Sequence, residues 1–146
     1  MAKSVWDTID DPSLDNGNRL PYLYPGKFLL SVRAISHYPS QKKRGEEWFR
    51  ADFDIVEGAT GGKNAVSWVV KLALTDEEAL DRSLRDIRAF VRALMGEDHP
   101  VNKALMVDLT GDDQPAAGLT VHCEAESVRT KSGGEYTKAR WFAVEV

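Results

Sequence analysis

Apolar and polar residues alternate along three segments in the first half of the chain, which is the spacing of half-buried β-strands. These segments are residues 27–37, 47–56 and 64–74. In the first segment, the alternation predicts a core face made of Phe28, Leu30, Val32 and Ala34. The second segment alternates most clearly, with Phe49, Ala51, Phe53 and Ile55 in one phase.

A single helix is predicted over residues 76–95, because apolar residues recur there at three- and four-residue spacing. The predicted stripe consists of Leu80, Leu84, Ile87, Val91 and Leu94. Thr75 followed by Glu78 predicts a capping box at the start, and Gly96 marks the end. The helix arginines, Arg82, Arg85, Arg88 and Arg92, fall largely off the stripe and are interpreted as a solvated face with local acidic partners.

Two further strands are predicted at residues 119–130 and 136–144, joined by a short turn at Ser132-Gly133-Gly134. In the last strand Phe142 shares its phase with the polar residues Lys138 and Arg140, so we expect a bulge near residues 140–141. Residues 101–109 fit a short helix and a strand equally well. Residues 20–26 contain two prolines and are expected to lie across one end of the domain.

The order strand-strand-strand-helix-strand-strand predicts a mainly β fold with one helix, the five-stranded OB barrel. The sequence divides into a flexible acidic arm at residues 1–21 and an OB domain at residues 22–146. In this fold, ligands bind the face of strands 2 and 3 and the loops 1–2 and 4–5. The corresponding loops, residues 40–45 and 129–134, are both basic.

Composition describes an ordinary globule of 146 residues, 42% hydrophobic and 29% charged. The net charge of −4 argues against a simple polyanion binder. However, residues 26–74 carry eight Lys or Arg against five Asp or Glu, which permits a local basic face. The single cysteine, Cys123, is expected to be buried, and the three histidines show no ligand spacing, so neither a metal nor another cofactor is predicted. No apolar signal segment begins the sequence, and a cytoplasmic protein without a membrane role is expected.

The candidate binding residues combine cations with flat rings, which is what a single nucleic-acid strand requires. They are Lys42, Lys43, Arg44, Trp48, Arg50, Arg129, Lys131, Tyr136, Lys138 and Arg140. Partial burial against the barrel rim is the alternative for Trp48, whereas Trp68 is expected in the core. For Lys42, Lys43 and Arg44 the alternative is an ordinary solvated loop tip.

Catalysis finds little support in the sequence. The glycines between residues 58 and 62 lack the lysine and the following helix of a phosphate-binding loop. No Ser or Cys lies in a nucleophile motif. Clustered carboxylates such as Asp112-Asp113 are better explained by solvation. The chain is therefore not expected to be an enzyme.

Several short motifs resemble the single-stranded DNA-binding proteins of tailed bacteriophages. They are residues 24–28 (Tyr-Pro-Gly-Lys-Phe), the loop at residues 42–45 before Trp48-Phe49, residues 53–55 and residues 130–136. The resemblance implies sequence-independent binding of single-stranded DNA during phage DNA replication or recombination, in the cytoplasm of an infected bacterium. It also implies contacts with replication or recombination proteins, and it leaves self-association into a homo-oligomer open.

Many proteins of that family end in an acidic tail with an aromatic tip, whereas this sequence stops at Val146 within its last predicted strand. Three explanations stay open: no partner recruitment, recruitment through the acidic N-terminal arm, or a truncated sequence. The rival interpretation of the whole domain is an OB-like protein-interaction or virion structural module without nucleic-acid binding, which the acidic net charge favours.

Overall fold

The structure, a computed structural model, describes residues 20–58, 64–131 and 133–144. In chain order these form β1 (Gly26–Pro39), β2 (Glu46–Glu57), β3 (Ala65–Ala73), α1 (Glu77–Met95), α2 (Lys103–Leu109), β4 (Thr120–Arg129) and β5 (Glu135–Phe142). The predicted strands and the predicted long helix are confirmed, each within two residues at either end. The undecided segment at residues 101–109 forms α2, whose first turn is capped by the Asn102 side chain. Most of the predicted N-terminal arm lies outside the described residues.

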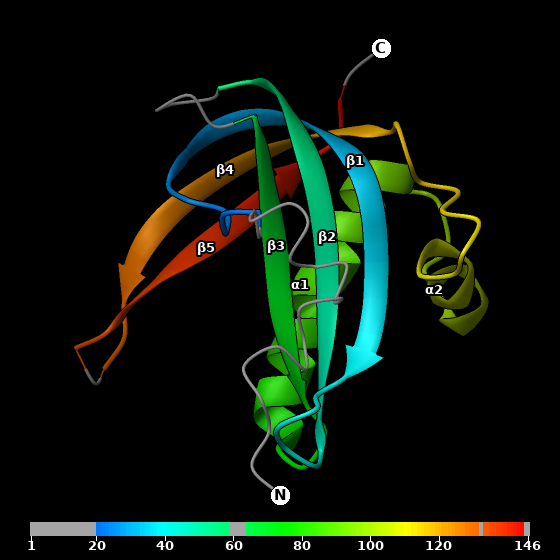
Figure 1. The fold of residues 1–146 in the computed structure, drawn as a ribbon. Coiled ribbons are helices and arrows are strands. Elements are labelled where there is room, and N and C mark those ends of the chain that lie inside the picture. The colour runs from blue at the N-terminus through cyan, green and yellow to red at the C-terminus, as the bar shows by residue number, and fades with distance from the viewer. Residues whose placement is uncertain (1–19, 59–63, 132, 145–146) are drawn as a thin grey trace, which may run out of the picture.

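The five strands form one antiparallel sheet in the order β3-β2-β1-β4-β5. β1 is the central strand, and it pairs with β4 through residues 26–31 and with β2 through residues 29–39. Figure 1 shows that the sheet curves strongly, with α1 behind β2 and β3. The mainly β class is confirmed. Closure into a barrel is not, because the described residues form no ladder between β3 and β5 and the sheet stays open.

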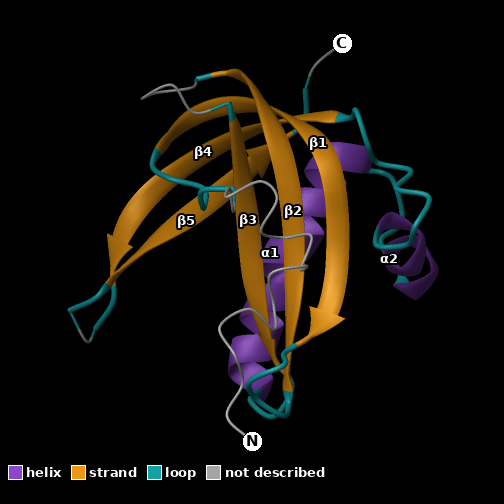
Figure 2. Cartoon of the chain, in the orientation of Figure 1, coloured by secondary structure: helices purple, strands orange, loops and turns teal. Residues whose placement is uncertain are grey.

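The core lies between the concave face of the sheet and α1, which contacts β3, β5 and β4 (Figure 2). Its centre is Phe90, which has 0% exposure and packs its ring against Phe53, Trp68 and Trp141 at centroid distances of 5.7, 5.3 and 4.7 Å. The rings of Trp68 on β3 and Trp141 on β5 also contact each other, at a centroid distance of 4.8 Å. The predicted stripe omitted Phe90 and included Leu84, which is 49% exposed.

The start of α1 also differs from the prediction by one residue. Asp76, not Thr75, is the N-cap, and its carboxylate accepts a hydrogen bond from the Ala79 N–H at 3.1 Å. The Asp76 N–H donates to the Ala73 carbonyl, which places the chain in a turn before the helix begins. Aspartate caps a helix as well as threonine does, so both residues satisfied the sequence rule.

Two predictions of strand phase were wrong. In β1 the pairing with β2 shifts between Val32 and Ala34, so Ile35 is fully buried in place of Ala34. In β5 no bulge forms, since pairing with β4 runs regularly from Glu135 to Phe142. Trp141 therefore points into the core, and Phe142 is 46% exposed. The position of a bulge depends on what each side chain packs against, and the alternation of apolar and polar residues does not predict those packing partners.

Residues 21–23 run beside β3 instead of across one end of the sheet. The Leu23 N–H donates to the Ser67 carbonyl and the Ser67 N–H donates to the Pro21 carbonyl, both at 2.9 Å. Leu23 is buried by this contact, and the neighbouring Tyr22 is 71% exposed. The segment thus covers part of the β3 edge and places an aromatic ring at the surface. Neither described helix is long and apolar enough to cross a membrane.

Cys123 is expected to resist thiol reagents in the native protein. It is 1% exposed, and burial, with a smaller contribution from Glu124, raises the pKa of its thiol to about 12. A thiolate is the reactive form, so native protein labelled with dithionitrobenzoate near pH 8 should react only as fast as it unfolds. The unfolded thiol loses its proton near pH 9, so this group also lowers stability as pH rises from about 9 to about 12. A Cys123→Ala variant should lose this pH-dependent contribution to the free energy of unfolding. Rapid labelling of the native protein would contradict the burial of the thiol.

Candidate nucleic-acid interface

Trp48 lies in the middle of a row of side chains that crosses three strands. Its direct neighbours are Tyr38 on β1 and Lys71 on β3. Residues paired in this way share one face of the sheet, with Cβ atoms about 4.5–5.5 Å apart. Tyr38 is 39% exposed, Lys71 is exposed and Trp48 is half-buried, so this row lies on the outer face, away from α1. The row combines two rings with one cation.

The loop between β1 and β2 is ordered by local hydrogen bonds. The Ser40 hydroxyl accepts from the N–H groups of Lys42 and Lys43, each at 3.3 Å, and the Ser40 N–H donates to the Glu46 carbonyl. Gly45 completes the turn at φ +78°, a conformation that side chains disfavour. The lysine side chains project into solvent, beside the row that contains Trp48.

These groups surround an open hollow of about 640 Å³, here called the outer hollow. Its lining is Tyr22, Tyr38, Pro39, Ser40, Gln41, Lys42, Lys43, Glu46, Trp48, Arg50 and Lys71. Four of these side chains are cationic, and Glu46 is the one carboxylate among them. Glu46 lies 4.0 Å from the Lys43 ammonium and 3.6 Å from that of Lys71. In the described chain, no carboxylate lies within ion-pair distance of Lys42, so the hollow keeps a positive balance.

Arg50 forms the cationic floor of the outer hollow. Its Nε donates to the Asp52 carboxylate at 2.8 Å. This hydrogen bond raises the pKa of Arg50 above its usual range, with a further contribution from Tyr38, against the opposing effect of burial. The guanidinium therefore stays charged, and the pairing with Asp52 holds it in place. Because a fixed guanidinium still has unused N–H donors, it retains the capacity to bind an anion.

A second hollow, here called the seam hollow, lies between β3, β5 and α1 and measures about 680 Å³. It is lined by Trp68, Val69, Val70, Lys71, Ala73, Ala79, Arg82, Ser83, Asp86, Thr130, Tyr136, Thr137, Lys138 and Ala139. Lys71 lines both hollows, so the surface continues from the loop between β1 and β2 across β3 to the last hairpin. Burial raises the pKa of Asp86 in the seam hollow, and Lys138 acts in the opposite direction.

The structure brings together some of the predicted binding residues and separates others. Lys42, Lys43, Trp48 and Arg50 line the outer hollow, and Tyr136 and Lys138 line the seam hollow. Arg44 and Lys131 are exposed on the two loops, which both lie toward the lower part of Figure 1, and Arg129 is exposed at the end of β4. Arg140 lies elsewhere: it pairs with Glu126 at 3.5 Å and lines a hollow that also contains Glu124.

Four residues at the two hollows were missed from the sequence: Tyr22, Tyr38, Lys71 and Arg82. Strand pairing was the signal that points to two of them, because the register places Tyr38 and Lys71 directly opposite Trp48. Arg82 was assigned to a solvated helix face, but it lines the seam hollow with Lys71 and Lys138. By contrast Arg85 pairs with Asp81 at 2.9 Å, as predicted for that face.

Comparison with known proteins adds no assignment. No protein-family model matches the chain, and a search of curated proteins finds no match.

Proposed function

We propose that this protein binds single-stranded DNA without sequence preference, on the outer face of β1, β2 and β3. The observation that carries the proposal is the outer hollow, where Trp48 lies between Tyr38 and Lys71 and beside Lys42 and Lys43. Cations that track phosphates and rings on which bases stack are the two requirements of such a site. We also propose that the open sheet is a variant of the OB barrel, which binds ligands on this same face.

The bound single-stranded DNA would run across the sheet, from the loop between β1 and β2 toward the hairpin of β4 and β5. Lys71 connects the two hollows, and the seam hollow adds Tyr136, which is 50% exposed, together with Lys138 and Arg82. Two ring-bearing surfaces along one cationic path would hold successive bases. Contacts of this kind are made to the backbone and to the faces of the bases, so binding would not depend on sequence.

The protein would act without catalysis, as a coat on single strands during phage DNA replication or recombination. The basis for the phage setting is the motif resemblance at residues 24–28 and 130–136. Replication or recombination proteins would then be further partners.

A protein-interaction or virion structural module is the alternative. The observations in its favour are the net charge of −4 and the position of Glu46, whose carboxylate lies within ion-pair distance of both Lys43 and Lys71. Such a module would meet its partner through the exposed rings of Tyr22 and Tyr38 and would not respond to DNA. Titration with oligo-dT distinguishes the two functions.

Binding to oligo-dT is expected to be strongly salt-dependent. Neutralising phosphates releases counterions, with a slope of about −0.7 in log K against log salt for each phosphate on a single strand. If Lys42, Lys43 and Lys71 each neutralise one phosphate, the slope should be about −2. Tryptophan fluorescence, followed during titration at several salt concentrations, measures both affinity and slope. Folded protein that shows no binding even at low salt would favour the protein-interaction module.

Replacing Trp48 should weaken oligo-dT binding and leave stability almost unchanged. Loss of one stacked base costs about 1–3 kcal/mol, so Trp48→Ala should raise the Kd by roughly 5- to 150-fold. Trp48→Phe keeps a ring and should recover most of the affinity, which separates stacking from a general disturbance. Because Trp48 is half-buried, thermal melts of both variants are needed. A large loss of stability with unchanged affinity would place Trp48 in a structural role.

A further inference from the structure

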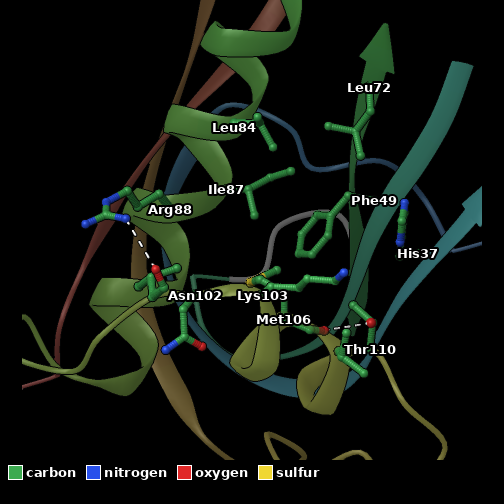
Figure 3. A pocket seen from close by; sticks show the side chains of 12 residues that line it. His37, Phe49, Leu72, Leu84, Ile87, Arg88, Asn102, Lys103, Met106 and Thr110 are labelled. Carbon is green, nitrogen blue, oxygen red and sulfur yellow. Dashed lines mark hydrogen bonds between the residues drawn. The ribbon is translucent and has the colours of Figure 1, made fainter. Parts of the chain in front are cut away.

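An apolar cavity of about 450 Å³ lies on the inner side of the sheet, between α1, α2 and the strands β1 to β3. Most of its wall is aliphatic or aromatic: Phe49, Leu72, Leu84, Ile87, Met106 and Val107. Figure 3 shows Leu84, Ile87 and Phe49 pointing toward the middle of this space. Phe49, Leu72 and Ile87 are buried, whereas Leu84 and Val107 are 49% and 60% exposed, so the cavity has a core floor and an apolar mouth.

α2 contacts the core through side chains, among them Leu109, which is 1% exposed, while its backbone stays clear of the strands. Figure 1 shows α2 beyond the edge of β1, and it makes no extensive backbone contact with any described strand or with α1. Gln114 holds the segment after α2 by bridging the backbone of Ile35, where it accepts from the N–H at 2.6 Å and donates to the carbonyl at 2.8 Å. The space is open to solvent on one side, and its volume lies within the range of small-molecule pockets.

The polar groups of the cavity favour a negative ligand. Lys103, Arg88 and His37 contribute to its lining, and none of the described lining residues is acidic. His37 is already bound to Glu47, at 2.6 Å, and Arg88 is turned toward the Val101 carbonyl at 3.5 Å (Figure 3). In the described chain, no carboxylate lies within ion-pair distance of the Lys103 ammonium. Lys103 is thus available to an anionic ligand, and Arg88 keeps N–H donors of its own because the Val101 carbonyl is a neutral acceptor.

We propose that this cavity binds one small amphiphilic anion, an apolar chain or ring that ends in a carboxylate. The apolar body would contact Phe49, Ile87 and Met106, and the carboxylate would pair with Lys103 at the edge. The site is separate from the outer hollow, because neighbouring residues of a strand point to opposite faces and Phe49 faces inward where Trp48 faces outward. Its occupancy does not depend on nucleic-acid binding.

The test is calorimetric titration of the intact protein with decanoate, kept below its micelle concentration, and with decanol as the uncharged control. Lys103→Gln removes the proposed counter-charge and should weaken decanoate binding about tenfold. It should not destabilise α2, because a cation at a helix N-terminus is unfavourable. Leu84→Trp fills the mouth from an exposed position and should weaken binding of both ligands at least tenfold. Arg85→Gln, on the same helix but outside the cavity lining, is the matched control and should bind as the parent does.

Saturable decanoate binding with these effects supports the proposal, as does oligo-dT binding that is unchanged by Lys103→Gln. Equal affinity for decanol and decanoate would overturn the assignment of an anion. Unchanged binding in Leu84→Trp would overturn the assignment of the cavity, and an absence of decanoate binding would overturn both. Binding to phosphatidylglycerol vesicles without binding of free decanoate would identify a membrane surface in place of a single-molecule site.

Discussion

Reversing the charge of the loop between β1 and β2 is expected to reduce oligo-dT affinity by two to three orders of magnitude. The variant replaces Lys42, Lys43 and Arg44 by Glu. Each lost contact of a cation with a phosphate removes about 1.5–3 kcal/mol at most, and three solvent-exposed contacts together would remove about 3–4 kcal/mol. The salt slope should fall in parallel, because fewer counterions are released. Fluorescence titration at two salt concentrations measures both effects.

A variant with the same charge change on the far side of the molecule is the control. It replaces Arg85, Arg88 and Arg92 on α1 by Glu and omits Arg82, because Arg82 lines the seam hollow. None of these three arginines lines the outer or the seam hollow, so the control should bind oligo-dT within a few-fold of the parent. If the helix variant lost binding while the loop variant kept it, the ligand surface would lie elsewhere. Reversing Arg129 and Lys131 should have a smaller effect, since Arg129 already faces Glu135 at 4.0 Å.

Phe90→Ala is expected to cost more stability than any exposed substitution on α1. Phe90 has 0% exposure, and four aromatic rings pack around it, from Phe49, Phe53, Trp68 and Trp141. Truncating a buried phenylalanine costs about 3–5 kcal/mol, through lost transfer free energy and the cavity left behind. A domain of this size has a total stability of about 5–15 kcal/mol, so the loss is a large share of it. Urea unfolding followed by circular dichroism gives the difference.

Two further variants keep this prediction testable. Phe90→Leu retains most of the volume and should cost less than Phe90→Ala while still folding. Leu84→Ala, on the same helix, removes a side chain that is 49% exposed and should cost under about 1 kcal/mol. If Phe90→Ala and Leu84→Ala were equally mild, the aromatic cluster between α1 and the sheet would not be the centre of the core.

Patterns within single segments were enough to predict the elements. Alternation located β1 to β4, the predicted turn after β4 located β5, and three- and four-residue spacing located α1, because each pattern reflects contacts that an element makes along its own length. The same patterns failed where packing against another element decides which side chains face the core. Ile35 enters the core through a shift of pairing in β1, and Trp141, not Phe142, faces Phe90. The stripe on α1 was centred wrongly for the same reason, since only packing against Trp68 and Trp141 makes Phe90 the middle of the helix face.

By itself the sequence determined that this is a mainly β domain with one long amphipathic helix, two basic loops and a tryptophan on the polar face of β2. The tertiary structure decided which residues gather around that tryptophan. Strand register places Tyr38 and Lys71 beside Trp48. On β5, Arg140 pairs with Glu126 of β4 and does not line the outer or the seam hollow. The tertiary structure also decided that the described residues form no ladder between β3 and β5 and that Leu109 of α2 enters the core. These features arise from contacts between residues far apart in the chain, and the spacing of residues within one segment does not encode them.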